Sequence, residues 1–304
     1  MKLVSVILPV FALVLIGWIG RVRQLLSPAA FQGLRDVVFF LAMPALLFSA
    51  IVNAPPFDLV AVTSVYFTAS LSIFACGFAF ARLLRCPLAT AAMLGLNSAY
   101  GNTVMVGIPV IVAALGPEAL PSLLAIVALH SAILLPLASA LVEMDRGGRR
   151  SWTAMAGAVA AALRNPIIVS IFVAFLWRAA HLSLPDPVGE LLRLLSAAST
   201  PLALICLGGS LPPLNARALD AEAALGAGLK LVALPALVAA LGRLAHLQGL
   251  PLTVAILLGA MPTGANAFLL ARHDERLAEV SAATVVVTTL LSPLTLSALL
   301  QLVA

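Results

Sequence analysis

The sequence predicts an all-α integral membrane protein with ten transmembrane helices arranged as two inverted five-helix repeats. Only 10% of the 304 residues are charged and 62% are hydrophobic, whereas about 25% of the residues of a soluble domain are charged. The hydrophobic residues gather into ten long segments, and unusual positions in these segments recur in both halves of the chain. So few charged residues cannot cover a surface that faces water, which excludes a soluble protein.

The lengths of the hydrophobic segments match the thickness of a bilayer. A hydrocarbon core of about 30 Å needs on the order of 20 apolar residues per helix. We divide the chain where proline, glycine and charged residues cluster, which leaves only short connections and no room for a soluble domain. The ten predicted spans are residues 3–20, 32–52, 58–81, 88–115, 119–142, 166–180, 188–210, 222–243, 249–271 and 279–302.

The positively charged residues between the spans predict the orientation of the chain. Twelve lie in loops after odd-numbered spans, and four lie on the opposite side, namely Lys2, Arg178, Arg193 and Arg243. Because lysine and arginine accumulate on the cytoplasmic side, we expect both termini to be periplasmic. The sequence pI of about 9.7 fits a bacterial inner membrane, where lipids would surround the protein. The net charge of +5 therefore reflects topology, and no nucleic-acid partner is expected.

Five predicted spans lie on each side of the longest polar segment. We expect a first repeat at 1–142, a cytoplasmic loop at 143–165 whose second half lies on the membrane surface as an amphipathic helix, and a second repeat at 166–304. With an odd number of spans per half, the second half is inserted upside down. Pro44 and Pro201 occupy the second and seventh spans, and Asn102 and Asn266 occupy the fourth and ninth. These matched positions favour a duplicated, inverted repeat.

The fourth and ninth spans are the least suited to contact with lipid. They contain the polar, glycine- and proline-rich runs NSAYGNTVMVGIP and GAMPTGANAF. Helix breaks are predicted at Gly101, Pro109, Pro262 and Gly264, and freed backbone groups cost several kcal/mol unless they line a protein cavity. Interrupted helices at matching positions of two halves predict a binding site near the bilayer midplane. The alternative is that these small residues only allow tight helix packing.

Several motifs along nearly the whole chain resemble those of one transporter family. FFLAMPALLFSAIV, NTVMVGIP, TPLALICLGGSL, LKLVALP and AMPTGANAFLLAR fall in the order typical of the auxin efflux carrier family. Its plant members are the PIN-type auxin transporters, and its bacterial members resemble malate and malonate permeases. PIN-type proteins have proline where this chain has Gly101 and Ala267, so the resemblance does not extend to selectivity for auxin.

The resemblance implies an architecture and a division of labour between the spans. Broken helices four and nine would cross at the substrate site, as in NhaA-type antiporters and bile-acid symporters. Spans 1, 2, 6 and 7 would form a scaffold, which is expected to dimerise into a homodimer. Spans 3–5 and 8–10 would form a mobile transport unit.

Amide and hydroxyl side chains beside the breaks are candidates for contact with the substrate. They can donate hydrogen bonds to a carboxylate without burying a net charge. Asn102 and Thr103 are the first candidates, and Asn266 and Thr263 are their counterparts in the second half. The alternative role for each asparagine is to cap the end of a half-helix. The predicted substrate site comprises Asn97, Gly101, Asn102, Thr103, Thr263 and Asn266, together with Lys230 and His130.

Lys230 and His130 are two further candidates inside predicted spans, and both side chains are titratable. A lysine at mid-bilayer costs about 2.5–3.5 kcal/mol, so Lys230 is a candidate countercharge for an anion. It also lies close enough to the cytoplasmic end for its stem to snorkel. The imidazole of His130 titrates near neutral pH and is a candidate proton relay. Its alternative role is that of a hydrogen-bonded interior histidine.

The sequence contains no recognisable enzyme or metal motif. It has no HExxH and no paired carboxylates within a span. It also has no P-loop GxxxxGK[ST], which excludes an ATPase within this chain. Its three cysteines lack the spacing of a metal site. We therefore expect no enzymatic activity, no cofactor and no metal.

These observations predict a secondary transporter of small organic anions of the carboxylate class that works by elevator-like alternating access. Moving a dianion inward against a negative interior costs about 4.6 kcal/mol per 100 mV, so uptake requires co-transported protons or an exchanged anion. Efflux requires neither. The alternatives are a sodium- or proton-coupled symporter of the bile-acid type, and a membrane sensor or structural subunit that transports nothing. The acidic residues lie near span ends, which disfavours a sodium site that includes a carboxylate.

Overall fold

The computed structural model describes residues 2–53, 59–145, 164–210, 221–271 and 274–303. Over these residues the chain is helical, with no β-strand beyond one isolated β-bridge. Most of the loop predicted at 143–165, with its surface helix, lies outside the described residues. The chain forms two compact units, each built from segments distant in sequence.

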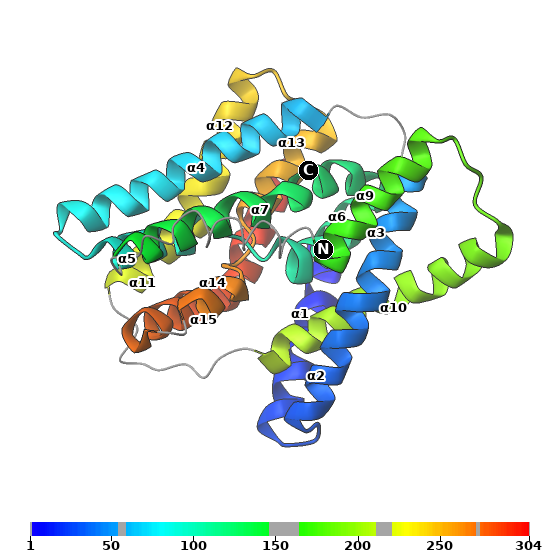
Figure 1. Ribbon diagram of the computed structural model, residues 1–304, viewed down its shortest axis with the longest axis horizontal. Helices are drawn as coiled ribbons and strands as arrows, with labels where there is room; N and C mark the ends of the chain where they lie inside the picture. The colour runs from blue at the N-terminus through cyan, green and yellow to red at the C-terminus, as the bar shows by residue number, and fades with distance from the viewer. Residues whose placement is uncertain (1, 54–58, 146–163, 211–220, 272–273, 304) are drawn as a thin grey trace. The chain divides into compact units, whose positions relative to one another are not determined.

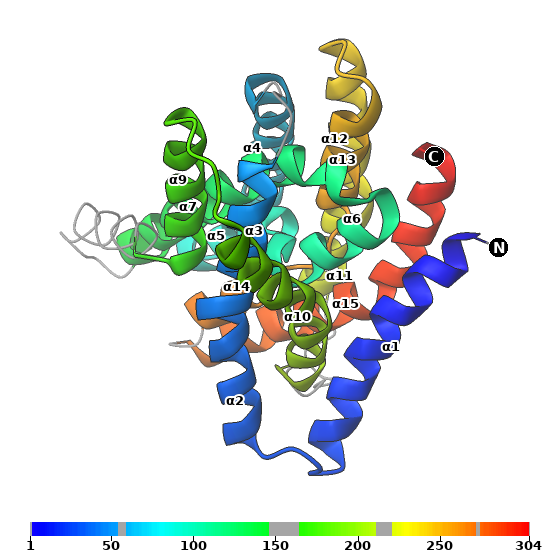
Figure 2. The same ribbon diagram turned by 90° about the vertical axis from the view of Figure 1, so that its right-hand side faces the viewer.

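Unit 1 comprises Met1–Phe57, Val104–Leu124 and Leu163–Leu211. Its main helices are α1 (Lys2–Val22), α2 (Pro28–Val37), α3 (Met43–Val52), α6 (Ile108–Leu115), α9 (Pro166–Ala179) and α10 (Asp186–Ser210). Within this unit α1 packs along α10 and α3 packs along α9 (Figure 2). The contact between α1 and α10 requires glycine, because a Cβ added at Gly208 would lie 1.8 Å from the carbonyl oxygen of Val14.

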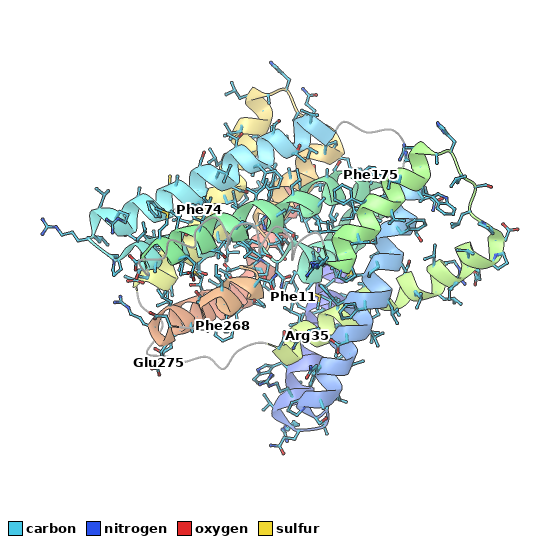
Figure 3. The ribbon with its side chains drawn as sticks, viewed as in Figure 1. Phe11, Arg35, Phe74, Phe175, Phe268 and Glu275 are labelled. Atoms are coloured by element: carbon cyan, nitrogen blue, oxygen red, sulfur yellow. The ribbon has the colours of Figure 1, made fainter. Side chains whose placement is uncertain are left out.

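Unit 2 comprises Asp58–Thr103, Ala125–Ala162 and Pro212–Ala304. Its helices are α4 (Leu59–Leu83), α5 (Leu88–Ala99), most of α7 (Leu120–Asp145), α11 (Ala221–Gly228), α12 (Leu234–Leu244), α13 (Gly249–Gly259), α14 (Ala265–Ala271) and α15 (Glu275–Val303). Within this unit α4 packs on α5, and α14 packs on α15 (Figure 1). Phe74 of α4 faces Gly95 of α5, and Glu275 marks the start of α15 (Figure 3).

Helix starts follow local capping rules. Ser27 precedes α2, and its hydroxyl oxygen accepts a hydrogen bond of 3.1 Å from the Ala30 N–H. Asn165 precedes α9, and its Oδ1 accepts one of 2.9 Å from the Ile167 N–H. Proline occupies the first position of both helices, where its missing N–H is not needed.

Six described helical segments are long and apolar enough to cross a membrane, which makes the chain a multi-pass membrane protein. These segments are Pro28–Val52, Val60–Leu83, Pro117–Asp145, Asp186–Ser210, Ala221–Leu244 and Glu275–Leu302. The predicted spans 88–115 and 249–271 are each divided into two shorter pieces, which is why neither reaches that length as one helix. The full count of ten spans stays a prediction.

Three π-helical segments share one sequence feature. They are η1 (Val38–Ala42), η2 (Thr103–Gly107) and η5 (Leu229–Ala233), and each is followed by an α-helix with proline at its second residue, namely Pro44, Pro109 and Pro235. Proline lacks an N–H and its ring clashes with the carbonyl four residues earlier, so a widened turn accommodates it. Pro109 therefore follows a widened turn at the start of α6 in unit 1, and the chain is interrupted earlier, at Tyr100 and Gly101.

Replacing Gly208 by alanine is expected to lower the unfolding temperature of the purified protein in detergent. The added Cβ would force α1 and α10 apart, and overpacking of this kind destabilises by about 1–3 kcal/mol. Gly33→Ala is the matched control, because no atom lies within 4 Å of the Cβ that it would add. Equal unfolding temperatures for the two variants would contradict the close contact.

Candidate functional site

The two broken helices of unit 2 meet at their breaks. Helix α5 ends at Ala99 and the chain is extended from Tyr100, whereas α13 ends at Gly259 and the chain makes a turn at Ala260 before it reaches Thr263. The Asn102 N–H donates a hydrogen bond of 2.7 Å to the Pro262 carbonyl, and the Gly264 N–H donates one of 3.0 Å to the Tyr100 carbonyl. Gly101 at the first break and Thr263 at the second form an antiparallel β-bridge. The breaks therefore satisfy part of each other's backbone hydrogen bonding.

At the first break, side chains replace a helical hydrogen bond. In an unbroken helix the Gly101 N–H would donate to the Asn97 carbonyl, four residues earlier. Here the Gly101 N–H donates to Nε2 of His130 at 3.0 Å, and the Asn97 carbonyl accepts a bond of 2.8 Å from the Thr263 hydroxyl. Both partners of the lost bond are thus satisfied within the protein.

The second break repeats this arrangement. The helical bond lost there would join the Thr263 N–H to the Gly259 carbonyl. The Thr263 N–H donates instead to the hydroxyl of Thr288 at 3.0 Å, and the Gly259 carbonyl accepts a bond of 2.5 Å from Nζ of Lys230. His130 and Thr288 therefore each accept the freed N–H of one break. Thr263 and Lys230 each donate to the freed carbonyl.

Lys230 places a buried cation at the crossing. Its side chain comes from the widened turn η5 and has 0% relative exposure. A Cβ added at Gly101 would lie 3.2 Å from Nζ, so a larger residue there would require the Lys230 side chain to shift by a few tenths of an ångström. Among the described residues, Lys230 is the only lysine, arginine, aspartate or glutamate that is buried. Its charge has no carboxylate partner there, and the side chain does not snorkel to the surface.

His130 of α7 is held by aromatic rings and one backbone bond. Its ring stacks on Tyr100, with centroids 4.9 Å apart and planes 14° apart, and Tyr66 of α4 lies 5.7 Å away. Because Nε2 accepts the Gly101 N–H, a neutral His130 carries its proton on Nδ1. Nδ1 is buried and bonds to no described residue. The imidazole therefore has one engaged nitrogen and one unused donor.

Two asparagines frame the crossing. Asn97 is buried and its Nδ2 donates to the Ser281 hydroxyl of α15 at 3.1 Å, while its Oδ1 bonds to no described residue. Asn266 is exposed, and its Nδ2 donates to the Tyr100 hydroxyl at 3.1 Å. That hydroxyl also shares a bond of 2.9 Å with Ser131. The Asn97 amide thus bonds to α15, whereas the Asn266 amide belongs to a separate group of hydrogen bonds with Tyr100 and Ser131.

The remaining predicted residues divide between the crossing and its surroundings. Asn102 is half-buried beside the bridge, and Thr103 is buried at the start of η2. Across the bridge, the Asn102 N–H donates to Pro262 just as the Gly264 N–H donates to Tyr100. Gly264, rather than Asn266, therefore occupies the position at the second break that corresponds to Asn102. A Cβ added at Gly264 would lie 2.4 Å from the Tyr100 ring, so this break requires glycine.

Sequence reasoning missed several residues that surround the crossing. Thr288 and Ser281 lie on α15, and Tyr66 lies on α4 with its ring 5.7 Å from that of His130. Small hydroxyl residues are common in membrane helices because they bond to their own backbone, so no local signal separates these positions from others.

The crossing presents hydrogen-bond donors and one positive charge, and no carboxylate of the described residues is buried there. The described residues also contain no group of three or more histidine, cysteine, aspartate or glutamate side chains that could hold a metal ion. A site with these groups is suited to an anion, because a carboxylate accepts hydrogen bonds from ammonium, amide and backbone N–H groups.

Comparison with known proteins adds two findings. A family model described as "Membrane transport protein" matches residues 3–152 and 149–300. A protein of Rhizobium meliloti (strain 1021) named "Putative malonate transporter" is 30% identical over 314 aligned residues, which cover 99% of this chain and 96% of the relative.

Replacing Thr263 by valine is expected to destabilise the protein. The change keeps the side-chain shape but removes the hydroxyl that bonds to the Asn97 carbonyl, and an unsatisfied buried acceptor costs about 1–3 kcal/mol. Thr253→Val is the control, since its hydroxyl bonds only within the exposed turn of α13. Thermal unfolding in detergent should show a clear loss for Thr263→Val alone. Equal shifts would mean that the first break does not depend on Thr263.

Proposed function

The chain belongs to the membrane transport protein family of auxin efflux carrier-like proteins, and on this basis we propose that it is a secondary transporter of small organic anions. The membership makes it a transporter rather than an enzyme. Carboxylates are the proposed substrate class, supported by the relative whose printed name specifies malonate. Asn102, Thr103 and Lys230 are the proposed substrate contacts.

The observation that carries this proposal is the burial of Lys230 at the crossing. Removing a cation from water costs several kcal/mol unless an opposite charge compensates it. The described part of the chain offers Lys230 one hydrogen-bond partner, the Gly259 carbonyl, and the nearby imidazole of His130 supplies no negative charge. A bound carboxylate would supply the missing negative charge, so substrate and protein complete one ion pair.

The fold supports alternating access between a scaffold and a mobile unit. In this proposal unit 1 is the scaffold, formed by spans 1, 2, 6 and 7, and unit 2 is the transport unit, formed by spans 3–5 and 8–10. The division of the chain into these units supports it, although Val104–Leu124 groups with unit 1. The ten-span inverted repeat is supported by the matching bonds of His130, on the fifth span, and Thr288, on the tenth.

The proposed setting is a bacterial inner membrane, with periplasmic termini and the scaffold forming a homodimer. The distribution of lysine and arginine supports the orientation. Unit 1 carries large exposed apolar side chains such as Leu15 and Trp18 of α1 and Phe40 of η1. Lipid tails or a second copy would cover such a surface.

Coupling to sodium is the second candidate mode of transport, and the site favours it less. Sodium sites need several oxygen ligands, often with a carboxylate, and the described residues at the crossing supply hydroxyl, amide and carbonyl oxygens only. Replacement of sodium by choline is therefore expected to leave substrate affinity unchanged.

Transient currents in proteoliposomes test the proposed function. Exposing vesicles to a panel of mono- and dicarboxylates, including malonate and malate, should give a current with at least one of them. Asn102→Ala should abolish that current, because it removes an amide donor beside the bridge, while Asn53→Ala, on unit 1, should retain it. A current unchanged in Asn102→Ala would place the site elsewhere.

Replacing Lys230 by methionine separates a binding role from a structural one. The neutral side chain has similar length, so we expect substrate affinity to fall by more than about tenfold. The removal of a buried unpaired charge offsets the loss of the bond to the Gly259 carbonyl, so the unfolding temperature should change by only a few degrees. Arg243→Met, at the end of α12, is the control. Unchanged affinity in Lys230→Met would exclude the proposed ion pair.

A further inference from the structure

We infer that His130 couples the binding of the anion to the uptake of one proton, so that the two bind together at the first break. This inference rests on the proposed function and specifies its coupling ion. Its basis is the hydrogen bond in which Nε2 of His130 accepts the Gly101 N–H. The acceptor of that bond is the nitrogen that a proton would occupy.

Protonation of His130 changes the first break directly. An imidazolium has two N–H donors and no acceptor, so the Gly101 N–H loses its partner. Two donor groups would then face each other across 3.0 Å. An oxygen that accepts from both removes this conflict, and a carboxylate has the lone pairs to do so.

The surroundings of His130 make the proton depend on the anion. The titratable groups that face the imidazole are Tyr66 from α4, Tyr100 from the end of α5 and Lys230 from η5. The ammonium group of Lys230 opposes a second positive charge nearby, and no described carboxylate is buried there to offset it. An anion beside Lys230 and Gly101 removes that opposition. Binding of the anion therefore favours the proton, and by linkage the proton favours the anion to the same extent.

A second observation points to a ligand at this position. Nδ1 of His130 is fully buried and bonds to no described residue. In both protonation states this nitrogen carries an N–H, and a buried donor without a partner costs about 1–3 kcal/mol. A ligand group or a water molecule that accepts from Nδ1 would repay this loss.

Coupling of this kind resolves the energetics of uptake. A dianion moving inward against a negative interior carries two unfavourable charges. One accompanying proton reduces the net charge moved to one, and a proton gradient directed inward supplies further driving force.

Calorimetric titration of the full-length protein with malonate tests the inference. At pH 7–8, where malonate is a dianion, titrations in buffers of different ionisation enthalpy report the protons taken up on binding. We expect about one proton to be taken up per malonate in the wild type. The affinity should then weaken by up to about tenfold for each unit by which the pH rises. His130→Gln keeps a side-chain acceptor for the Gly101 N–H but cannot titrate in this range, so it should bind malonate with no proton uptake and little pH dependence. His246→Gln, an exposed histidine after α12, should behave like the wild type.

The outcomes distinguish this inference from the proposed function. Equal proton uptake in the wild type and His130→Gln, or none in the wild type, overturns the inference and leaves the anion transporter intact. If His130→Gln does not bind malonate, the wild type in proteoliposomes decides. Accumulation of malonate driven by an acidic exterior and abolished by a protonophore supports coupling, and its absence overturns it. Failure of the wild type to bind or transport any carboxylate overturns the proposed function itself.

Discussion

Every backbone polar group at membrane depth must find a hydrogen-bond partner within the protein, and the structure of unit 2 depends on this constraint. Breaking two helices frees N–H and C=O groups that a bilayer cannot satisfy. The two breaks satisfy some of these groups in each other through the bridge at Gly101 and Thr263. Three others bond to side chains from α7, α15 and η5, and the Asn97 carbonyl bonds to the Thr263 hydroxyl. The packing of those helices around the crossing is therefore a requirement of the breaks.

The side chains that complete the backbone are also those best suited to bind an anion. Lys230 donates to the Gly259 carbonyl, and His130 accepts from the Gly101 N–H, so each is oriented before a substrate arrives. Positioning through packing and hydrogen bonds of this kind lowers the entropic cost of binding. It also means that a ligand which engages either side chain alters the hydrogen bonding of a helix break. Binding and conformational change thus share the same groups.

The widened turns show a second way in which proline shapes this protein. Pro44, Pro109 and Pro235 each follow a π-helical segment, where the ring avoids the carbonyl of the preceding turn. In η5 the widened turn carries Lys230, and π-helical turns are frequent at functional sites. The prolines therefore do not interrupt these helices, whereas the breaks at the crossing occur where glycine allows close approach to Lys230 or Tyr100.

The sequence by itself determined the class of protein and its apolar segments, and it indicated two regions in which helices break, although α6 runs through Pro109 without a break. Composition and segment length follow from the thickness of the bilayer, and glycine and proline act on the chain locally, so both can be deduced without a fold. Only the tertiary structure decided which partners the freed groups find. It placed Lys230 in the interior rather than at the interface, made Gly264 the counterpart of Asn102, and brought Thr288 to the second break. Hydrogen-bond partners distant in sequence leave no local pattern, because a threonine or histidine in an apolar helix looks the same whether it bonds to its own turn or to another helix.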